Sequence, residues 1–297
     1  MEATEPSLHF VFGYGSLIRA ISRERTIPLS PTTASQPAVA AHAHGFCRLW
    51  CIRGESRKYT ALGCVQVQAH QAGESATTTR SPPCACSDGD VWMDDCDNVI
   101  GGVVFCVGGD GNLELLDKRE AGYRRVPLPL SSLRPYPSSQ TTSNLPPGSH
   151  LWIYVLTPDS PVFALPNPEY PLAQTYIDTC VAGCIESVDL EFAKEFVAST
   201  FRHTWSHVLR HRTGAGLPLY CGATCLAPPH IASPPPPSAE PVQCEKPLCT
   251  CLPWCNDRMF ARNPNWIRDN PCEEVDDVIG KALGSGWLAH RVAGRIA

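Results

Sequence analysis

The stretch that most constrains the fold lies near the N-terminus, where a run of aromatic and β-branched residues meets two closely spaced glycines. The run is Phe10-Val11-Phe12, and the glycines are Gly13 and Gly15. Such side chains favour a buried strand, and the glycines allow a tight turn, so we expect a strand followed by a turn in which Ser16 caps the next segment. N–H groups in a turn without Cβ atoms can bind a carboxylate or an amide oxygen, although Gly-rich junctions also occur as plain turns.

Composition and charge narrow the class of protein. The chain has 297 residues, 43% of them hydrophobic, which is enough for one large domain or two. A net charge of -5 argues against a nucleic-acid partner, and no stretch approaches the ~20 apolar residues of a membrane span. The acidic start, residues 1–7, has neither a basic end nor an apolar run, so we expect no signal or transit peptide. These features predict a cytoplasmic protein without a nucleic-acid, membrane or protein partner.

The sixteen cysteines allow two interpretations. Several, such as Cys64 and Cys106, lie in apolar strand-like runs, and we expect most to be reduced. A separate cluster surrounds the proline-rich residues 228–241 and comprises Cys221, Cys225, Cys244, Cys249, Cys251 and Cys255. Its spacings are not those of two C-x-x-C pairs, which favours free thiols in a loosely ordered insertion over a zinc site.

Hydrophobic periodicity predicts a mixture of strands and helices. We expect strands over residues 45–53, 59–67, 99–107 and 151–156, and helices over residues 112–120, 171–184 and 190–200. The glycines of the strand at 99–107 indicate a bulge or a close approach of two backbones. Pro171 suits a first helical position, and residues 22–41, which prolines interrupt, look irregular.

Two residues in these helices have both a structural and a functional interpretation. Glu120 ends the helix over 112–120, where the negative end of the helix dipole raises the pKa of a carboxyl group toward that of a useful base. Alternatively, it is a solvated charge among the neighbouring cations Lys118, Arg119, Arg124 and Arg125. Tyr176 is either a packed core residue or a ligand contact.

Taken in order, these motifs resemble the γ-glutamylcyclotransferase-like superfamily, which includes glutathione-specific and AIG2-like members. Residues 12–17 match its Phe/Tyr-Gly-Tyr-Gly-Ser-Leu/Asn loop, and residues 116–123 match the segment of its catalytic glutamate. Residues 45–50 resemble its Gly-aromatic-x-Arg-x-Trp strand, and residues 176–184 resemble its later helix. The likeness resumes at residues 253–258 and runs to the helix near residues 275–279.

The resemblance implies an α+β fold, a barrel-like mixed sheet with flanking helices, in one domain over residues 1–290. A low-complexity insertion at 69–98 and a Cys/Pro-rich insertion at 213–251 would interrupt it. It further implies cyclisation of a γ-glutamyl peptide or amine to 5-oxoproline without a cofactor or metal, with Glu120 as the catalytic residue. The implied substrate-binding residues are Tyr14, Gly15, Ser16, Leu17 and Tyr176, and adjacency to Glu120 adds Tyr123.

Two departures from the glutathione-specific branch bear on the substrate. Arg19 stands where that branch commonly has an aromatic residue, and only Ala121 and Gly122 separate Glu120 from Tyr123. The resemblance therefore leaves γ-glutamyl amino acids and γ-glutamylamines open as substrates. A different class also remains: a non-catalytic binding protein of the same fold, with zinc in its Cys/Pro insertion.

Overall fold

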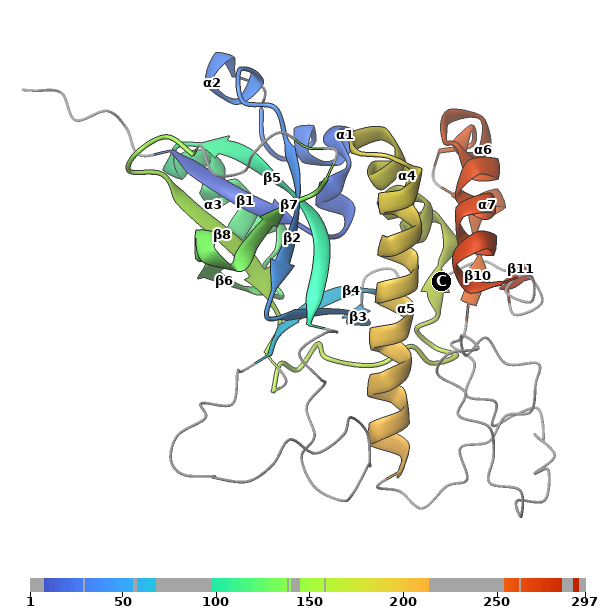
Figure 1. Cartoon of the computed structure of the whole chain (residues 1–297). Helices are drawn as coiled ribbons and strands as arrows, with labels where there is room; N and C mark the ends of the chain where they lie inside the picture. The colour runs from blue at the N-terminus through green and yellow to red at the C-terminus, as the bar shows by residue number, and fades with distance from the viewer. Residues whose placement is uncertain are drawn as a thin grey trace, which may run out of the picture.

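The protein is described by a computed structural model in which two mixed sheets and a layer of helices pack around a common core (Figure 1). It describes residues 8–28, 30–55, 58–67, 98–137, 139, 145–157, 159–213, 254–261, 263–284 and 291–293, with the backbone alone for 205–213 and 292–293. This arrangement confirms the expected α+β class with mixed sheets flanked by helices.

The larger sheet has the strand order β6-β8-β1-β5-β2-β7. Its centre is β1 (His9–Gly13), which runs parallel to β8 (His150–Val155) and antiparallel to β5 (Val99–Gly108). The outer strands are β2 (Val39–His44), β6 (Arg124–Pro127) and β7 (Leu133–Pro135). The first predicted strand is therefore central to the fold.

Glycines in β5 allow β1 to lie very close to it. A Cβ atom on Gly102 would lie 2.5 Å from Cζ of Phe12 and 2.6 Å from the carbonyl oxygen of Gly13. No side chain fits at such distances, so the sequence-based expectation of a close backbone approach is confirmed.

The second sheet has the order β11-β10-β9-β4-β3. Its long antiparallel pair is β3 (Phe46–Gly54) with β4 (Tyr59–Gln66), as predicted. Three short parallel strands extend it: β9 (Leu172–Ala173), β10 (Trp254–Asn256) and β11 (Arg291–Ala293). Segments from the end of the chain thus complete a sheet that begins near residue 46.

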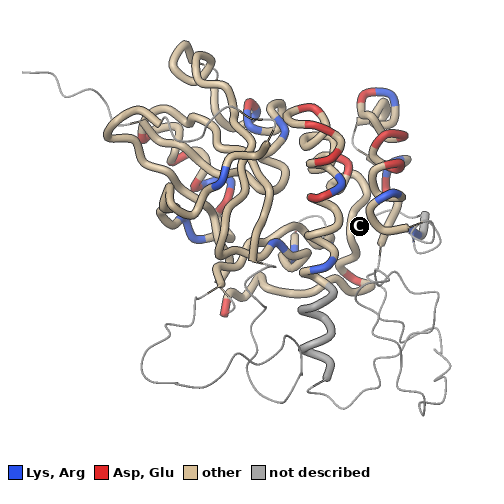
Figure 2. The backbone as a smooth tube through the Cα atoms, viewed as in Figure 1, with Lys and Arg blue, Asp and Glu red and all other residues tan. Residues whose placement is uncertain are grey.

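The helices pack beside the sheets, and Figure 1 shows α4 and α5 between the larger sheet and the C-terminal α6 and α7. The α-helices are α1 (Ala20–Glu24), α2 (Pro31–Ala34), α3 (Asp110–Arg119), α4 (Gln174–Ser187), α5 (Leu190–Thr213), α6 (Trp266–Asp269) and α7 (Cys272–Leu283). The 3₁₀ turns are η1 (Ser16–Ile18), η2 (Leu130–Ser132) and η4 (Arg258–Phe260). The charged residues of α7 are mostly acidic, and its basic residue, Lys281, lies in the last turn (Figure 2).

Four local expectations were wrong. Gly15, not Ser16, is the N-cap of η1, and Ser16 is its first residue. Residues 22–41 hold most of α1, all of α2 and the start of β2 rather than irregular chain. Pro171 precedes strand β9, so α4 begins at Gln174. Helix α3 begins at Asp110 and ends at Arg119, which leaves Glu120 as its C-cap.

Much of what the sequence predicts for the insertions lies outside the described residues. This holds for residues 69–97, for 214–251 and for every cysteine of the cluster except Cys255. The single domain over residues 1–290 therefore stays a prediction. One cluster of buried apolar side chains does include residues from Val11 to Leu283, so both ends of the described chain share a core.

A buried arginine on β3 links four parts of this core. The Arg48 side chain is inaccessible to solvent, and its Cζ lies 3.8 Å from the ring centre of Phe196. It donates to the carbonyl oxygens of Tyr14 (3.2 Å), Gly101 (2.7 Å) and Phe196 (3.1 Å). Its other donors bind the hydroxyls of Thr200 and Ser199. Among the described side chains no carboxylate pairs with Arg48, so main-chain and hydroxyl oxygens take the place of a counter-ion.

We expect Arg48→Met to lower the free energy of unfolding by about 2–4 kcal/mol, because three buried carbonyl oxygens lose their donor while the volume changes little. Arg53→Met on the same strand is the matched control. Its side chain is 37% exposed, and we expect a loss below about 1 kcal/mol. Urea unfolding monitored by circular dichroism gives both values, and equal losses would contradict the role assigned to Arg48.

Candidate active site

The turn after β1 presents a run of main-chain N–H groups. Gly15 has φ -136° and ψ -130°, and η1 follows it. Among the described residues none accepts a hydrogen bond from the N–H of Gly15, Ser16 or Leu17, as expected for the start of a 3₁₀ turn. A Cβ on Gly13 would lie 2.8 Å from that of Leu17, so glycine is required for this fold-back. The turn therefore offers three adjacent donors, the arrangement that binds anionic oxygen.

Glu120 lies at the end of α3, and its side chain is 14% exposed. Burial raises the pKa of its carboxyl group, whereas Arg119, whose Nε lies 3.1 Å from Oε1, lowers it. The direction of the net shift agrees with the sequence-based expectation, but its main cause is desolvation, not the helix dipole. The alternative of a solvated surface charge is wrong.

Three predicted tyrosines surround this carboxyl group. Burial is the main cause of a strongly raised pKa at Tyr14, Tyr123 and Tyr176, and the Glu120 charge raises each further. Their hydroxyls therefore stay protonated at any physiological pH. The turn, the end of α3 and α4 together bring these three side chains and Glu120 to one place.

The three hydroxyls differ in their partners. The Tyr14 hydroxyl donates to the carbonyl oxygen of Tyr154 (2.8 Å), and that of Tyr123 donates to the carbonyl oxygen of Leu62. The Tyr176 hydroxyl lies 3.7 Å from the point where a Cβ on Gly15 would stand. The hydroxyl groups of Tyr14 and Tyr123 thus donate to main-chain oxygens of the fold, whereas the hydroxyl group of Tyr176 lies beside the glycine turn.

Arg119 connects the acid to the turn. Its Nη2 donates to Oγ of Ser16 at 3.1 Å, and its Nε pairs with Glu120. From the sequence, Arg119 was expected only to be a charge beside Glu120. Tyr59 was not predicted, although its ring centre lies 5.5 Å from that of Tyr176. The adjacency of Arg119 and Glu120 was the available signal for the first residue, whereas no pattern indicated the second.

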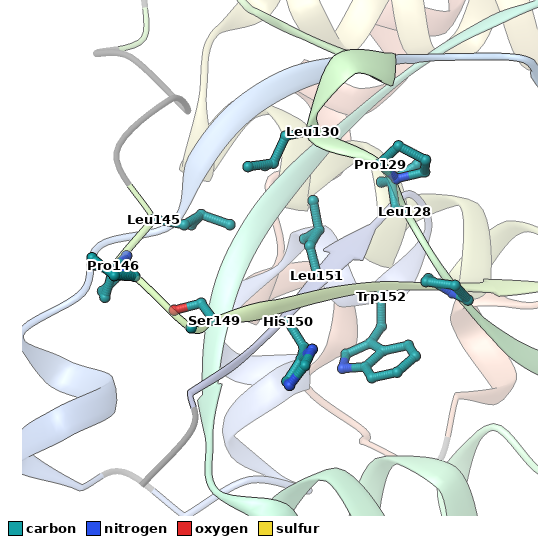
Figure 3. Close-up of a pocket in the computed structure, with 12 residues that line it drawn as sticks. Leu128, Pro129, Leu130, Leu145, Pro146, Ser149, His150, Leu151 and Trp152 are labelled. Carbon is teal, nitrogen blue, oxygen red and sulfur yellow. The ribbon is translucent and has the colours of Figure 1, made fainter. Parts of the chain in front are cut away.

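The pocket in Figure 3 is a different feature. It has a volume of about 410 Å³ and is lined mainly by Pro and Leu residues of segments 127–130 and 145–152. These segments include the start of β8, whereas Tyr154, near the other end of that strand, meets Tyr14. None of the candidate site residues lines it, so we assign the candidate site to the Glu120 cluster.

The described residues contain neither a cluster of metal ligands nor a helix that could cross a membrane. Within them no three His, Cys, Asp or Glu side chains come together as a metal site. No helix in this part of the chain combines the length and apolar character that a membrane crossing requires.

Comparison with solved structures gives similarities to γ-glutamyl cyclotransferases. A structure described as a gamma-glutamyl cyclotransferase is 14% identical, with 64% of this chain and 86% of that chain covered and a TM-score of 0.39. A yeast γ-glutamyl cyclotransferase specific to glutathione is 17% identical, with coverages of 66% and 86% and a TM-score of 0.33. The YkqA protein of Bacillus subtilis is 12% identical, with coverages of 65% and 53% and a TM-score of 0.36.

The first two structures bear the name of the superfamily that the sequence motifs resemble. No family model and no curated protein matches the chain. Because all three TM-scores lie below 0.5, the proposal for function rests on the site and the sequence motifs.

The raised pKa of Glu120 predicts how its contribution to stability varies with pH. Its carboxyl group has a higher pKa in the folded than in the unfolded chain, so its ionisation disfavours folding as the pH rises through the folded pKa. Glu120→Gln removes this ionisation. We therefore expect the free energy of unfolding of the variant, relative to wild type, to increase from pH 4 to pH 8.

Denaturant titrations across this pH range measure the difference. Glu114→Gln, on the same helix but exposed, is the matched control and should show no such trend. A difference for Glu120→Gln that decreases with pH would mean that its ionised form is stabilised by the fold.

Proposed function

We propose that the protein is a γ-glutamylcyclotransferase, which converts a γ-glutamyl peptide or amine into 5-oxoproline and the free amine. The observation that carries the proposal is the joint presence of a largely buried carboxyl group of raised pKa and three N–H donors that have no acceptor among the described residues. Arg119 links the two through Glu120 and Ser16. The order of the sequence motifs supports the same assignment.

The reaction needs one proton carrier and one binding site for oxygen. The substrate's α-amino nitrogen attacks its own γ-carbonyl carbon, which closes a five-membered lactam and releases the amine bound there. The α-ammonium nitrogen loses two protons as it becomes the lactam N–H, and the departing nitrogen gains two as it leaves as an ammonium ion. Glu120 accepts each proton from the first nitrogen and delivers it to the second. Because the attack is intramolecular, much of the rate acceleration comes from holding the cyclising conformer.

The glycine turn supplies the oxygen site. The N–H groups of Gly15, Ser16 and Leu17 are placed to bind the substrate carboxylate or the oxyanion of the tetrahedral intermediate. Tyr176 adds a protonated hydroxyl beside this turn. Tyr14 and Tyr123 keep their hydroxyl protons on main-chain oxygens, and we assign them to shaping the site.

We expect Glu120→Gln to lower 5-oxoproline formation by about 10²-fold or more, because a glutamine amide cannot accept the proton and return it. The assay compares glutathione, γ-Glu-Ala and γ-glutamyl-lysine, which separates the three substrate classes. Glu114→Gln controls for a charge change on α3 and should retain activity. Turnover by a folded Glu120→Gln variant at the wild-type rate would rule out this mechanism. Binding of these compounds without turnover by wild type would favour the non-catalytic alternative.

We expect Tyr176→Phe to lower kcat about tenfold or more while the fold is kept, because the hydroxyl beside the glycine turn is lost. Tyr136→Phe is the matched control. The Tyr136 hydroxyl donates to Asp189 and lies outside the Glu120 cluster. Steady-state kinetics on the best of the three substrates measures both variants. Equal activity of the two would remove Tyr176 from the reaction.

A further inference from the structure

All three guanidinium nitrogens of Arg119 contact oxygen atoms of the protein: Nη1 and Nη2 donate four hydrogen bonds, and Nε forms an ion pair. Nη1 donates to the carbonyl oxygen of Ser22 (2.6 Å) and to Oγ1 of Thr26 (3.1 Å). Nη2 donates to Oγ of Ser16 (3.1 Å) and of Ser22 (3.0 Å), and Nε pairs with Oε1 of Glu120 (3.1 Å). A guanidinium group has five N–H bonds, so the four N–H bonds of Nη1 and Nη2 are used within the protein and the fifth, on Nε, lies on the side of Glu120.

These contacts join three separate segments. Ser16 opens η1, Ser22 lies in α1, Thr26 follows it, and Glu120 caps α3. A second arginine holds η1 to α1, since Arg23 Nη1 donates to the carbonyl oxygens of Leu17 (2.8 Å) and Ile18 (2.6 Å). The two segments that accept hydrogen bonds from Arg119, η1 and α1, are therefore held to each other. This favours a single position for the guanidinium group of Arg119.

Within the part of the chain that the structure describes, the other titratable groups whose pKa the Glu120 charge raises are tyrosines, which are neutral at physiological pH. Tyr14 comes from the turn, Tyr123 follows α3, Tyr154 lies on β8 and Tyr176 lies on α4. Among the described side chains, Arg119 is the one that forms an ion pair with Glu120. A cation whose Nη1 and Nη2 donors are occupied by protein oxygens, and whose Nε is paired with the acid, is placed to act on that acid and not on a substrate.

We propose that Arg119 is a positioning residue, which holds the Glu120 carboxylate beside the glycine turn in its charged form without contacting the substrate. This inference rests on the proposed function for its catalytic consequence, although the coupling between the two side chains stands by itself. It makes the chain's Arg-Glu pair one functional unit. It also assigns recognition of a substrate carboxylate to groups other than this arginine.

The test compares Arg119→Gln and Arg119→Lys with wild type by two measurements. The first is the titration of the Glu120 side-chain carboxyl carbon by NMR in ¹³C-labelled protein. The second is the pH dependence of kcat and KM for 5-oxoproline formation. Lys118→Gln is the control, because Lys118 is an exposed neighbour on the same helix and should change neither.

For Arg119→Gln we expect the midpoint of the Glu120 titration to move to higher pH, because burial then acts without the opposing cation. The acid limb of kcat should move in the same direction, since the base must be ionised. At neutral pH kcat should fall about tenfold while KM changes less than about twofold. Arg119→Lys should restore part of the titration midpoint, because it retains the charge.

Two results would overturn the inference. One is an unchanged Glu120 titration in folded Arg119→Gln, and the other is a large rise in KM at constant kcat, which would place Arg119 on the substrate. If Arg119→Gln does not fold, Ser22→Ala gives the same readouts, since it removes one acceptor that fixes the guanidinium group. If wild type forms no 5-oxoproline, the proposed function fails, but the NMR titration still decides whether Arg119 controls Glu120.

Discussion

The structure depends on a buried positive charge that is neutralised by oxygen dipoles instead of a carboxylate. Arg48 lies between β3, β5, α5 and the glycine turn, and its pKa falls to about 10 because of burial, so it remains charged at neutral pH. Desolvating a cation is costly unless every donor is satisfied, which makes the arrangement around it all-or-none. The carbonyl oxygen of Tyr14 belongs to that arrangement, so the fold and the candidate site are stabilised together.

The same chemistry recurs at the site, where arginines bind the turn from several directions. Arg48 binds its start, Arg23 binds the carbonyl oxygens at its end and Arg119 binds Ser16. Carbonyl and hydroxyl acceptors of the turn are thereby occupied, while its N–H groups have no acceptor in the part of the chain that the structure describes. A backbone segment held in this way needs little reorganisation when it binds a negative oxygen, which is the physical basis of preorganised electrostatic catalysis.

The end of the chain contributes to the same region through α4, the helix that carries Tyr176. Arg258 forms two-pronged ion pairs with Asp178 and Asp276, and Asp257 accepts from both N and Oγ1 of Thr175 at the start of α4. Bidentate pairs of this kind fix orientation as well as position. These contacts thus fix the helix that carries Tyr176, although Arg258 and Asp178 are 80 positions apart in the sequence.

The sequence by itself determined the elements and the candidate acid. Alternation and glycine spacing identified β1, β3, β4, β5 and β8, because periodicity and backbone freedom are local properties, and the motif order indicated Glu120 and Tyr176. It could not determine that Pro171 precedes a strand or that Ser16 accepts from Arg119, since both depend on contacts with distant segments. Only the tertiary structure decided which hydroxyls are already used and why the pKa of Glu120 is raised. Burial and hydrogen-bond partners are set by the packing of the whole chain, and no local pattern encodes them.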